Sequence, residues 1–212
     1  NNVVFIAING LVGLQLAPFG WMATLPVMGY VVGGALSTPL VAQSQARWGR
    51  KVSFQIGLAV AVVSAALCAW AAFSASFWLL CTATVVAGYY SANGGLYRFA
   101  AAELAKPDYR EKAVSLVLAG GLLGAVAGPN LASATRTLFP VPFAGAYIAL
   151  IGVALLSMLC MAAIRFEAQP VVLNAAGQRE QGRPLKVLMR QPAFIVAIVG
   201  AALGYGVMNL LM

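Results

Sequence analysis

Six long apolar blocks, and the start of a seventh, run along this sequence with short polar segments between them. The blocks cover residues 3–17, 22–42, 52–73, 77–102, 113–135 and 143–164, and the seventh opens at Pro192. Most of them are close to the ~20 residues that a helix needs to cross a bilayer. Only 8% of the residues are charged, against about 25% in a typical soluble domain. The sequence therefore predicts an all-α integral membrane protein whose first partner is the lipid bilayer.

Several function classes are excluded by the residues that the sequence lacks. The chain has no His, so it can form neither a Ser-His-Asp or Cys-His triad nor a His-based zinc site. Cys68, Cys81 and Cys160 lie far apart inside apolar blocks, which argues against a redox motif or a disulfide framework. No phosphate-binding glycine loop is present. We expect no enzyme, no cofactor and, despite the net charge of +8, no nucleic-acid partner.

The positions of the basic residues predict the orientation. The connections after blocks 22–42, 77–102 and 143–164 hold three, three and five of the 13 Lys and Arg residues. Cytoplasmic loops collect Lys and Arg, so these three connections are expected in the cytoplasm. Trp70 and Trp78 lie at the opposite ends of their blocks, where an interfacial aromatic belt is expected.

The order of the blocks predicts the domains. Residues 1–165 form a six-helix domain built from two three-helix repeats, about 1–76 and 77–165, whose middle helices are rich in glycine. Residues 166–191 form a polar cytoplasmic linker, and 192–212 begin a seventh helix that the chain end cuts short. We expect a fragment of a longer protein, because a seventh helix cut at Met212 would lack its partners. The two repeats favour a transporter, because transporters are often built from such repeats.

Polar side chains inside the apolar blocks are candidates for solute contact, because polar groups are costly in hydrocarbon. Tyr90, Asn93 and Tyr97 are three and seven positions apart and share one helical face. Arg98 is an ionisable residue within a block; it is expected to bind an anionic group, to extend to the interface, or to pair with an acidic neighbour such as Glu103 or Asp108. Asn9 and Gln15 are further candidates. No Asp or Glu lies within a block, so if transport is proton-coupled, the titrating group is expected at Glu103 near the membrane edge or in the half that this chain lacks.

Two segments resemble motifs of the major facilitator superfamily. Arg47-Trp48-Gly49-Arg50-Lys51 is similar to the end of its loop signature, although Ala46 replaces the usual Asp and Ala42 the leading Gly. Residues 120–129 resemble its glycine-proline motif. The resemblance implies a twelve-helix secondary transporter with inverted three-helix repeats, whose C-terminal six-helix half is missing from this chain. It implies helices one, four and seven at the central cavity and helices two and five at the domain contact. It also implies gating roles for Arg47, Gly49, Arg50, Lys51, Gly120, Gly124, Gly128 and Pro129.

Residues 97–103, 115–129 and 204–212 resemble a bacterial branch of the superfamily that holds copper importers and riboflavin importers. This resemblance implies a protein of the bacterial inner membrane, and the substrate predictions rest on it. Met208 and Met212 are four residues apart and share a helix face; their side chains suit either apolar packing or Cu(I) ligation by thioethers. The resemblance to the copper importers implies the metal role and makes copper the first predicted cargo. Riboflavin is the second, with Tyr90, Tyr97 and Arg98 as stacking and polar contacts. Drug or metabolite efflux is a third possibility. A membrane-embedded enzyme or a receptor is the alternative from another class.

Overall fold

The structure is a computed structural model that describes residues 2–135, 139–164, 166 and 190–211. Every regular element in these ranges is a helix. The chain divides into two compact units, Asn1–Ala168 and Gln169–Met212. Each unit is described by itself.

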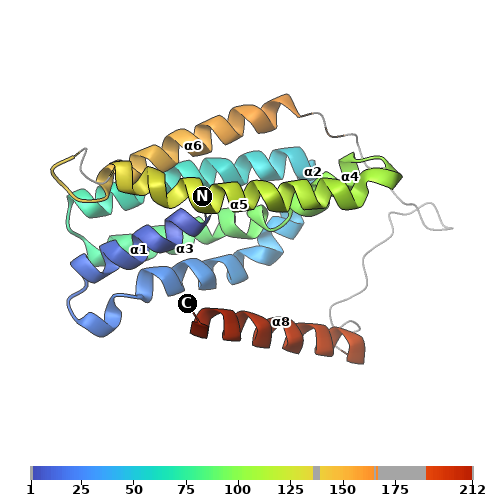
Figure 1. The fold of residues 1–212 in the computed structure, drawn as a ribbon. Helices are drawn as coiled ribbons and strands as arrows, with labels where there is room; N and C mark the ends of the chain where they lie inside the picture. Colours follow the sequence, from blue (N-terminus) through green and yellow to red (C-terminus); the bar gives the residue numbers. More distant parts are fainter. Residues whose placement is uncertain (1, 136–138, 165, 167–189, 212) are drawn as a thin grey trace. The chain divides into compact units, whose positions relative to one another are not determined.

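The first unit is a bundle of helices joined by short turns (Figure 1). Its α-helices are α1 (Asn2–Leu16), α2 (Leu25–Phe73), α3 (Phe77–Gly94), α4 (Tyr97–Leu104), α5 (Arg110–Thr135) and α6 (Ala144–Ala163). Two 3₁₀ turns, Gly20–Met22 and Pro107–Tyr109, precede α2 and α5. The helix ends agree with the predicted blocks within a few residues, except at two places.

The first difference concerns the predicted loop after block 22–42. The helix α2 continues through Arg47 and Trp48, and the only non-helical residue in its 49 residues is Gly49, with φ 81° and ψ 168°. This combination of φ and ψ is essentially restricted to glycine, so this residue reverses the chain within a single position. The first arm of α2 (25–48) and the second arm (50–73) therefore run in opposite directions (Figure 1), and α3 packs against both.

The second difference concerns block 77–102, which was predicted as one continuous helix. The structure breaks it into α3 and α4 at Gly95 and Leu96. The Leu96 amide bonds the Asn93 carbonyl at 3.0 Å, three residues back, which is the tighter 3₁₀ pattern. Two adjacent glycines, Gly94 and Gly95, weaken the helix at this point because each lowers helix propensity by about 1 kcal/mol relative to alanine.

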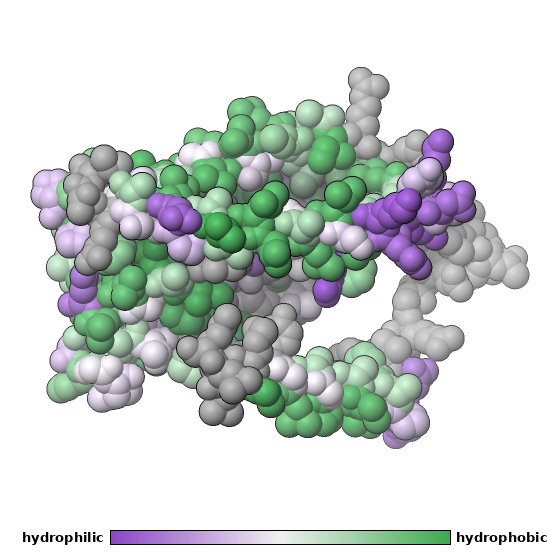
Figure 2. All heavy atoms as spheres, viewed as in Figure 1, coloured by the Kyte–Doolittle hydropathy of each residue, from purple (hydrophilic) through white to green (hydrophobic). Residues whose placement is uncertain are grey.

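The outer surface of the first unit is largely apolar. Leu122 and Leu123 on α5 are each 74% exposed, and green apolar residues cover much of the face in Figure 2. Three helical stretches, Gly20–Phe73, Pro107–Thr135 and Ala144–Ala163, are long and apolar enough to cross a membrane. Such a surface suits lipid and not water, which agrees with the predicted all-α membrane fold.

The first arm of α2 and α3 pack with their backbones in close approach. A Cβ atom at Gly33 would overlap the backbone of Val85, and one at Gly88 would overlap the backbone of Gly33 and Gly34. Small residues allow this approach, which gives membrane helices much of their contact energy. The buried core continues beside it through Phe5, Ile8, Leu80 and Tyr147.

In the second unit, the described residues form α8 (Pro192–Leu211), an apolar helix that begins at the predicted Pro192. Pro suits the first turn of a helix, where its missing N–H costs nothing. The predicted linker 166–191 falls outside the described residues except at Phe166, Arg190 and Gln191.

Candidate functional site

Charged and polar contacts join three helices where the two arms of α2 meet. We call this the basic end; it comprises the Gly49 turn and the C-termini of α4 and α6. Arg50 forms an ion pair with Glu103 of α4. Lys51 donates a hydrogen bond from Nζ to the Ala162 carbonyl at 2.7 Å, which places a cation at the negative end of α6. Figure 2 shows hydrophilic residues gathered at this end, over α4 and the start of α5.

Reversing the charge of Arg50 tests the ion pair. Arg50→Glu places two carboxylates side by side and is expected to lower the free energy of unfolding by about 1 kcal/mol, since both partners are partly exposed. The double variant Arg50→Glu/Glu103→Arg should recover most of this loss. Thermal unfolding in detergent measures both. Arg110→Glu is the matched control at the same end, and equal losses in the single and double variants would contradict the pair.

The polar residues predicted as solute contacts on block 77–102 differ in how far they are buried. Asn93 is fully buried; its Nδ2 donates to the Tyr89 carbonyl and its Oδ1 accepts from Ser53, both at 3.2 Å. Tyr97 lies edge-on to Phe54 at 4.8 Å between ring centroids, and its hydroxyl is buried with no hydrogen-bond partner among the described residues. Arg98 is exposed and stacks over Phe99 at 4.9 Å. The ion pair described for Glu103 is with Arg50.

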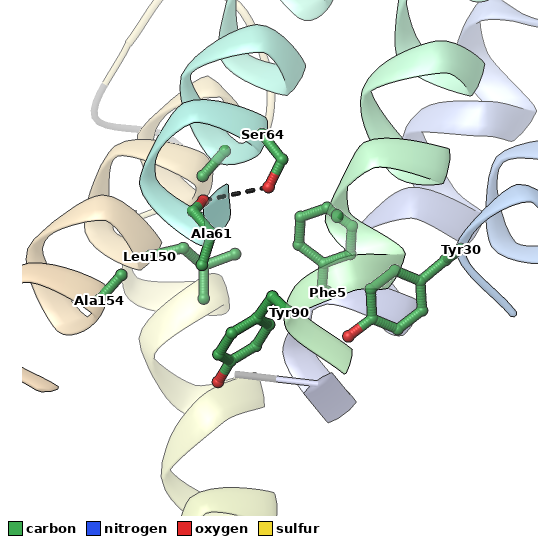
Figure 3. Close-up of a pocket in the computed structure, with 9 residues that line it drawn as sticks. Phe5, Tyr30, Ala61, Ser64, Tyr90, Leu150 and Ala154 are labelled. Carbon is green, nitrogen blue, oxygen red and sulfur yellow. Dashed lines mark hydrogen bonds between the residues drawn. The ribbon is translucent and has the colours of Figure 1, made fainter. Parts of the chain in front are cut away.

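Tyr90 lines a small pocket inside the bundle (Figure 3). The rings of Phe5 and Tyr30 lie on the same side of this pocket, and Leu150 and Ala154 of α6 lie on the other. Phe5 and Tyr30 are 5.1 Å apart between ring centroids, and the Tyr30 hydroxyl donates to Asn2 Oδ1 at 2.7 Å. The pocket has a volume of about 20 Å³, which is enough for one water molecule. In this conformation the aromatic rings therefore enclose no space large enough for a solute.

The two candidates on α1 lie in different surroundings. Asn9 is fully buried, donates to the Phe5 carbonyl at 2.8 Å and accepts from the Tyr147 hydroxyl at 2.7 Å. Gln15 is exposed near the end of α1. The structure therefore brings Asn9 into the aromatic core around Phe5, and it leaves Gln15 on the surface.

The predicted gating glycines of α5 lie mostly on open surface. A Cβ at Gly120, Gly121 or Gly124 would meet no atom of the described residues within 4 Å. At Gly128 it would overlap the Val4 side chain, so α5 approaches α1 closely there. The next residue, Pro129, lies inside α5 and is exposed.

The side chains of the two predicted copper ligands lie outside the described part of the chain. Met208 lies within α8, but its side chain is outside the described part of the chain, and so is the whole of Met212. Among the described residues, no group of three or more His, Cys, Asp or Glu side chains is arranged to hold a metal.

The sequence reasoning missed Tyr30, Asn2 and Ser53. Tyr30 donates a hydrogen bond to Asn2, and Ser53 donates one to Asn93, so each bond joins two helices. Tyr30 also lines the pocket. A signal was available for Tyr30 and Ser53, because each is a polar residue inside an apolar block. Their partners are 28 and 40 residues away, and no local spacing relates such residues.

The fold and its surface define a multi-pass membrane protein, and comparison with known proteins gives its family. The family model "Major Facilitator Superfamily" matches residues 1–212. The chain belongs to this superfamily, as its two motif segments predicted.

Curated relatives agree with this family. The chain is 33% identical over 212 residues to the riboflavin transporter RfnT of Brucella anthropi, covering 99% of this chain and 52% of that protein. It is 27% identical over 192 residues to the uncharacterized MFS-type transporter YdeG of Bacillus subtilis, covering 91% of this chain and 40% of that protein. The chain thus spans about half the length of these relatives. None of these names supports copper uptake, the first predicted substrate.

Proposed function

We propose that this chain is the six-helix N-terminal domain, the linker and the start of helix seven of a secondary transporter that carries riboflavin by alternating access. The observation that carries the proposal is the 33% identity to RfnT along essentially the whole chain. Transport is favoured over an enzyme because the sequence contains no His and no catalytic set. Riboflavin replaces copper as the substrate because no relative supports a metal cargo.

The side chains around the α3–α4 break fit the chemistry of this solute. Riboflavin has a flat heteroaromatic ring system with polar edges and a chain of hydroxyl groups. Tyr90 is half-buried beside Phe5 and Tyr30 and supplies an aromatic face for stacking. The buried Tyr97 hydroxyl, which has no partner among the described residues, supplies a hydrogen-bonding group nearby. Binding would require the small pocket to open, which is what alternating access provides.

Replacing Tyr90 tests the stacking role. Uptake of radiolabelled riboflavin by a riboflavin auxotroph that produces the protein is expected to fall about tenfold in Tyr90→Ala and to survive in Tyr90→Phe, which keeps the ring. The control is Tyr109→Ala, which removes an exposed ring from the turn before α5. Failure of the unaltered protein to rescue growth would overturn the substrate, whereas full uptake by Tyr90→Ala would overturn only the role of this residue.

A copper measurement separates the two substrate predictions. In the same cells, Met208→Leu/Met212→Leu is expected to leave riboflavin uptake unchanged, and cellular copper measured by mass spectrometry should not rise with expression. A rise in copper that this double variant abolishes would reverse the choice of substrate.

We also propose that the basic end faces the cytoplasm of a bacterial inner membrane. The supporting observation is that Arg50 and Lys51 lie at the same end of the bundle as the α4–α5 connection, which carries Lys106 and leads to Arg110 at the start of α5. In a variant with the native cysteines replaced, an impermeant thiol reagent added to intact cells should label Phe19→Cys and not Asp108→Cys. Both positions are exposed, so the reverse labelling would invert the orientation.

A further inference from the structure

Two buried asparagines, one on α1 and one on α3, make the same set of hydrogen bonds. Asn9 and Asn93 are both 0% exposed. The Nδ2 of each donates to the carbonyl four residues back on its own helix, at 2.8 Å and 3.2 Å. The Oδ1 of each accepts a hydroxyl from another helix, from Tyr147 of α6 at 2.7 Å and from Ser53 of the second arm of α2 at 3.2 Å.

The two sets of bonds occupy matching places in the two predicted three-helix repeats. The helices that carry the asparagines, α1 and α3, begin the first and the second repeat. The hydroxyl comes each time from the third helix of the other repeat, and each time from its fourth residue, Ser53 in the arm 50–73 and Tyr147 in α6. Two unrelated packing contacts would not be expected to share all these features. They indicate equivalent positions of a repeated unit.

The two hydroxyls lie toward opposite ends of the bundle. Ser53 is one turn from the reversal at Gly49, so it lies at the basic end. The last turn of α6 also lies at that end, because the Ala162 carbonyl accepts from Lys51. Tyr147, in the first turn of α6, therefore lies toward the other end. An inverted repeat places equivalent positions toward opposite faces of the membrane, and this arrangement agrees with one.

Each asparagine lies one helical turn from an aromatic ring of the small pocket. Phe5 and Tyr90 precede Asn9 and Asn93 by four and three residues, and residues so spaced share a helix face. Both rings line the pocket (Figure 3). Phe5 also lies edge-on to Tyr147, at 6.4 Å between ring centroids. An amide that is bonded both to its own helix and to a neighbouring helix fixes the rotation of its helix, and the direction of the ring is fixed with it.

We propose that Asn9 and Asn93 are positioning residues, equivalent in the two repeats, whose bonds to neighbouring helices set the rotation of α1 and α3. That rotation directs the rings of Phe5 and Tyr90 toward a flat aromatic solute. Hydroxyl and amide side chains that bond across membrane helices are a recognised source of such fixed packing. The inference rests on the proposed function, since riboflavin is the solute that the two rings would bind.

Removing only the donor hydroxyls tests the inference. Riboflavin fluorescence is quenched when its ring stacks on an aromatic side chain, so titration of the purified full-length transporter measures binding. Tyr147→Phe and Ser53→Ala are each expected to raise the riboflavin Kd about five- to tenfold, because each leaves a buried acceptor unpaired and its helix free to rotate. In cells, KM for uptake should rise by the same factor while the maximal rate changes little. A purely structural role would instead lower the maximal rate at constant KM.

The matched control is a buried hydroxyl that bonds within its own helix. Thr84 of α3 is 0% exposed, and its Oγ1 donates to the Cys81 carbonyl at 2.8 Å. Thr84→Val keeps the shape of the side chain and should leave the riboflavin Kd unchanged.

A double-mutant cycle separates positioning from direct contact with the solute. Asn9→Leu should raise the Kd as much as Tyr147→Phe does, and Asn9→Leu/Tyr147→Phe no more than either, because both changes remove one bond. Thermal unfolding in detergent shows which variants are folded. If Asn9→Leu does not fold, Tyr147→Phe and Ser53→Ala decide, since each removes a single oxygen atom.

Three outcomes would overturn the inference. The first is an unchanged Kd in either Tyr147→Phe or Ser53→Ala. The second is an equal rise in Thr84→Val, which would mean a general loss of packing. The third is a rise in the double variant that equals the product of the two single rises, which would mean that Asn9 contacts riboflavin independently. If the unaltered protein binds no riboflavin, the proposed function falls and this inference falls with it.

Discussion

Gly88→Val is expected to abolish the folded bundle. The α2 and α3 backbones meet at this residue, and a Cβ here would overlap the main chain of Gly33 and Gly34. A main chain cannot rotate away as a side chain can, so the two helices must separate along their whole contact. We expect a loss of at least about 3 kcal/mol in the free energy of unfolding, the upper end of the range for overpacking. Thermal unfolding in detergent and the yield of monodisperse protein measure it.

The matched control for this prediction lies across the same interface. A Cβ at Gly34 would be 3.6 Å from its nearest atom, the Gly88 carbonyl oxygen, which is ordinary contact. Gly34→Ala is therefore expected to fold as well as the unaltered protein. If Gly88→Val were as stable as Gly34→Ala, α2 and α3 could not pack as closely as described.

Phe54→Ala is expected to cost about 3–5 kcal/mol, the usual penalty for emptying a buried aromatic site. Phe54 is fully buried and contacts two other rings, Tyr97 at 4.8 Å and Phe166 at 6.0 Å between centroids. Its loss removes the packing that holds Tyr97 against the second arm of α2. The melting temperature in detergent should fall strongly in Phe54→Ala and much less in Phe54→Leu, which refills most of the volume.

An exposed phenylalanine at the same end provides the comparison. Phe99 is 50% exposed on α4, and Phe99→Ala should change the melting temperature little. Equal shifts in Phe54→Ala and Phe99→Ala would mean that the ring cluster around Phe54 contributes nothing specific.

Hydropathy was sufficient to predict most of the helices, because the length of an apolar run is fixed by the bilayer and can be read locally. The family was predicted from the two motif segments, residues 47–51 and 120–129. Hydropathy could not predict the Gly49 turn. Residues 43–48 are polar and resemble a loop, yet their backbone amides still prefer helical hydrogen bonds until glycine permits a reversal. The break at Gly95 had a local signal in the two adjacent glycines, but apolar residues on both sides concealed it.

The candidate site was harder to predict than the fold, because polarity marks a residue without showing its partner. Asn9 and Asn93 were chosen as polar residues within apolar blocks, and the structure shows both bonded to side chains on other helices. Whether either also contacts a solute stays a prediction. Tyr90 reaches its aromatic neighbours only after α1, α2 and α3 have packed, and no sequence spacing encodes that meeting.

The contacts of the second arm of α2 have a mechanical consequence for how the chain leaves the bundle. Lys51 and Gln55 donate to the Ala162 and Met158 carbonyls of α6, and the Phe54 ring lies tilted against that of Phe166 just beyond that helix. A force on the chain beyond Phe166 would therefore act on the residues next to Gly49, the position in α2 whose backbone angles are not helical. Through the Arg50–Glu103 pair the same force would reach α4. Because the residues that contact the end of α6 adjoin Gly49, a displacement of the chain beyond α6 would act to rotate the two arms of α2 about Gly49.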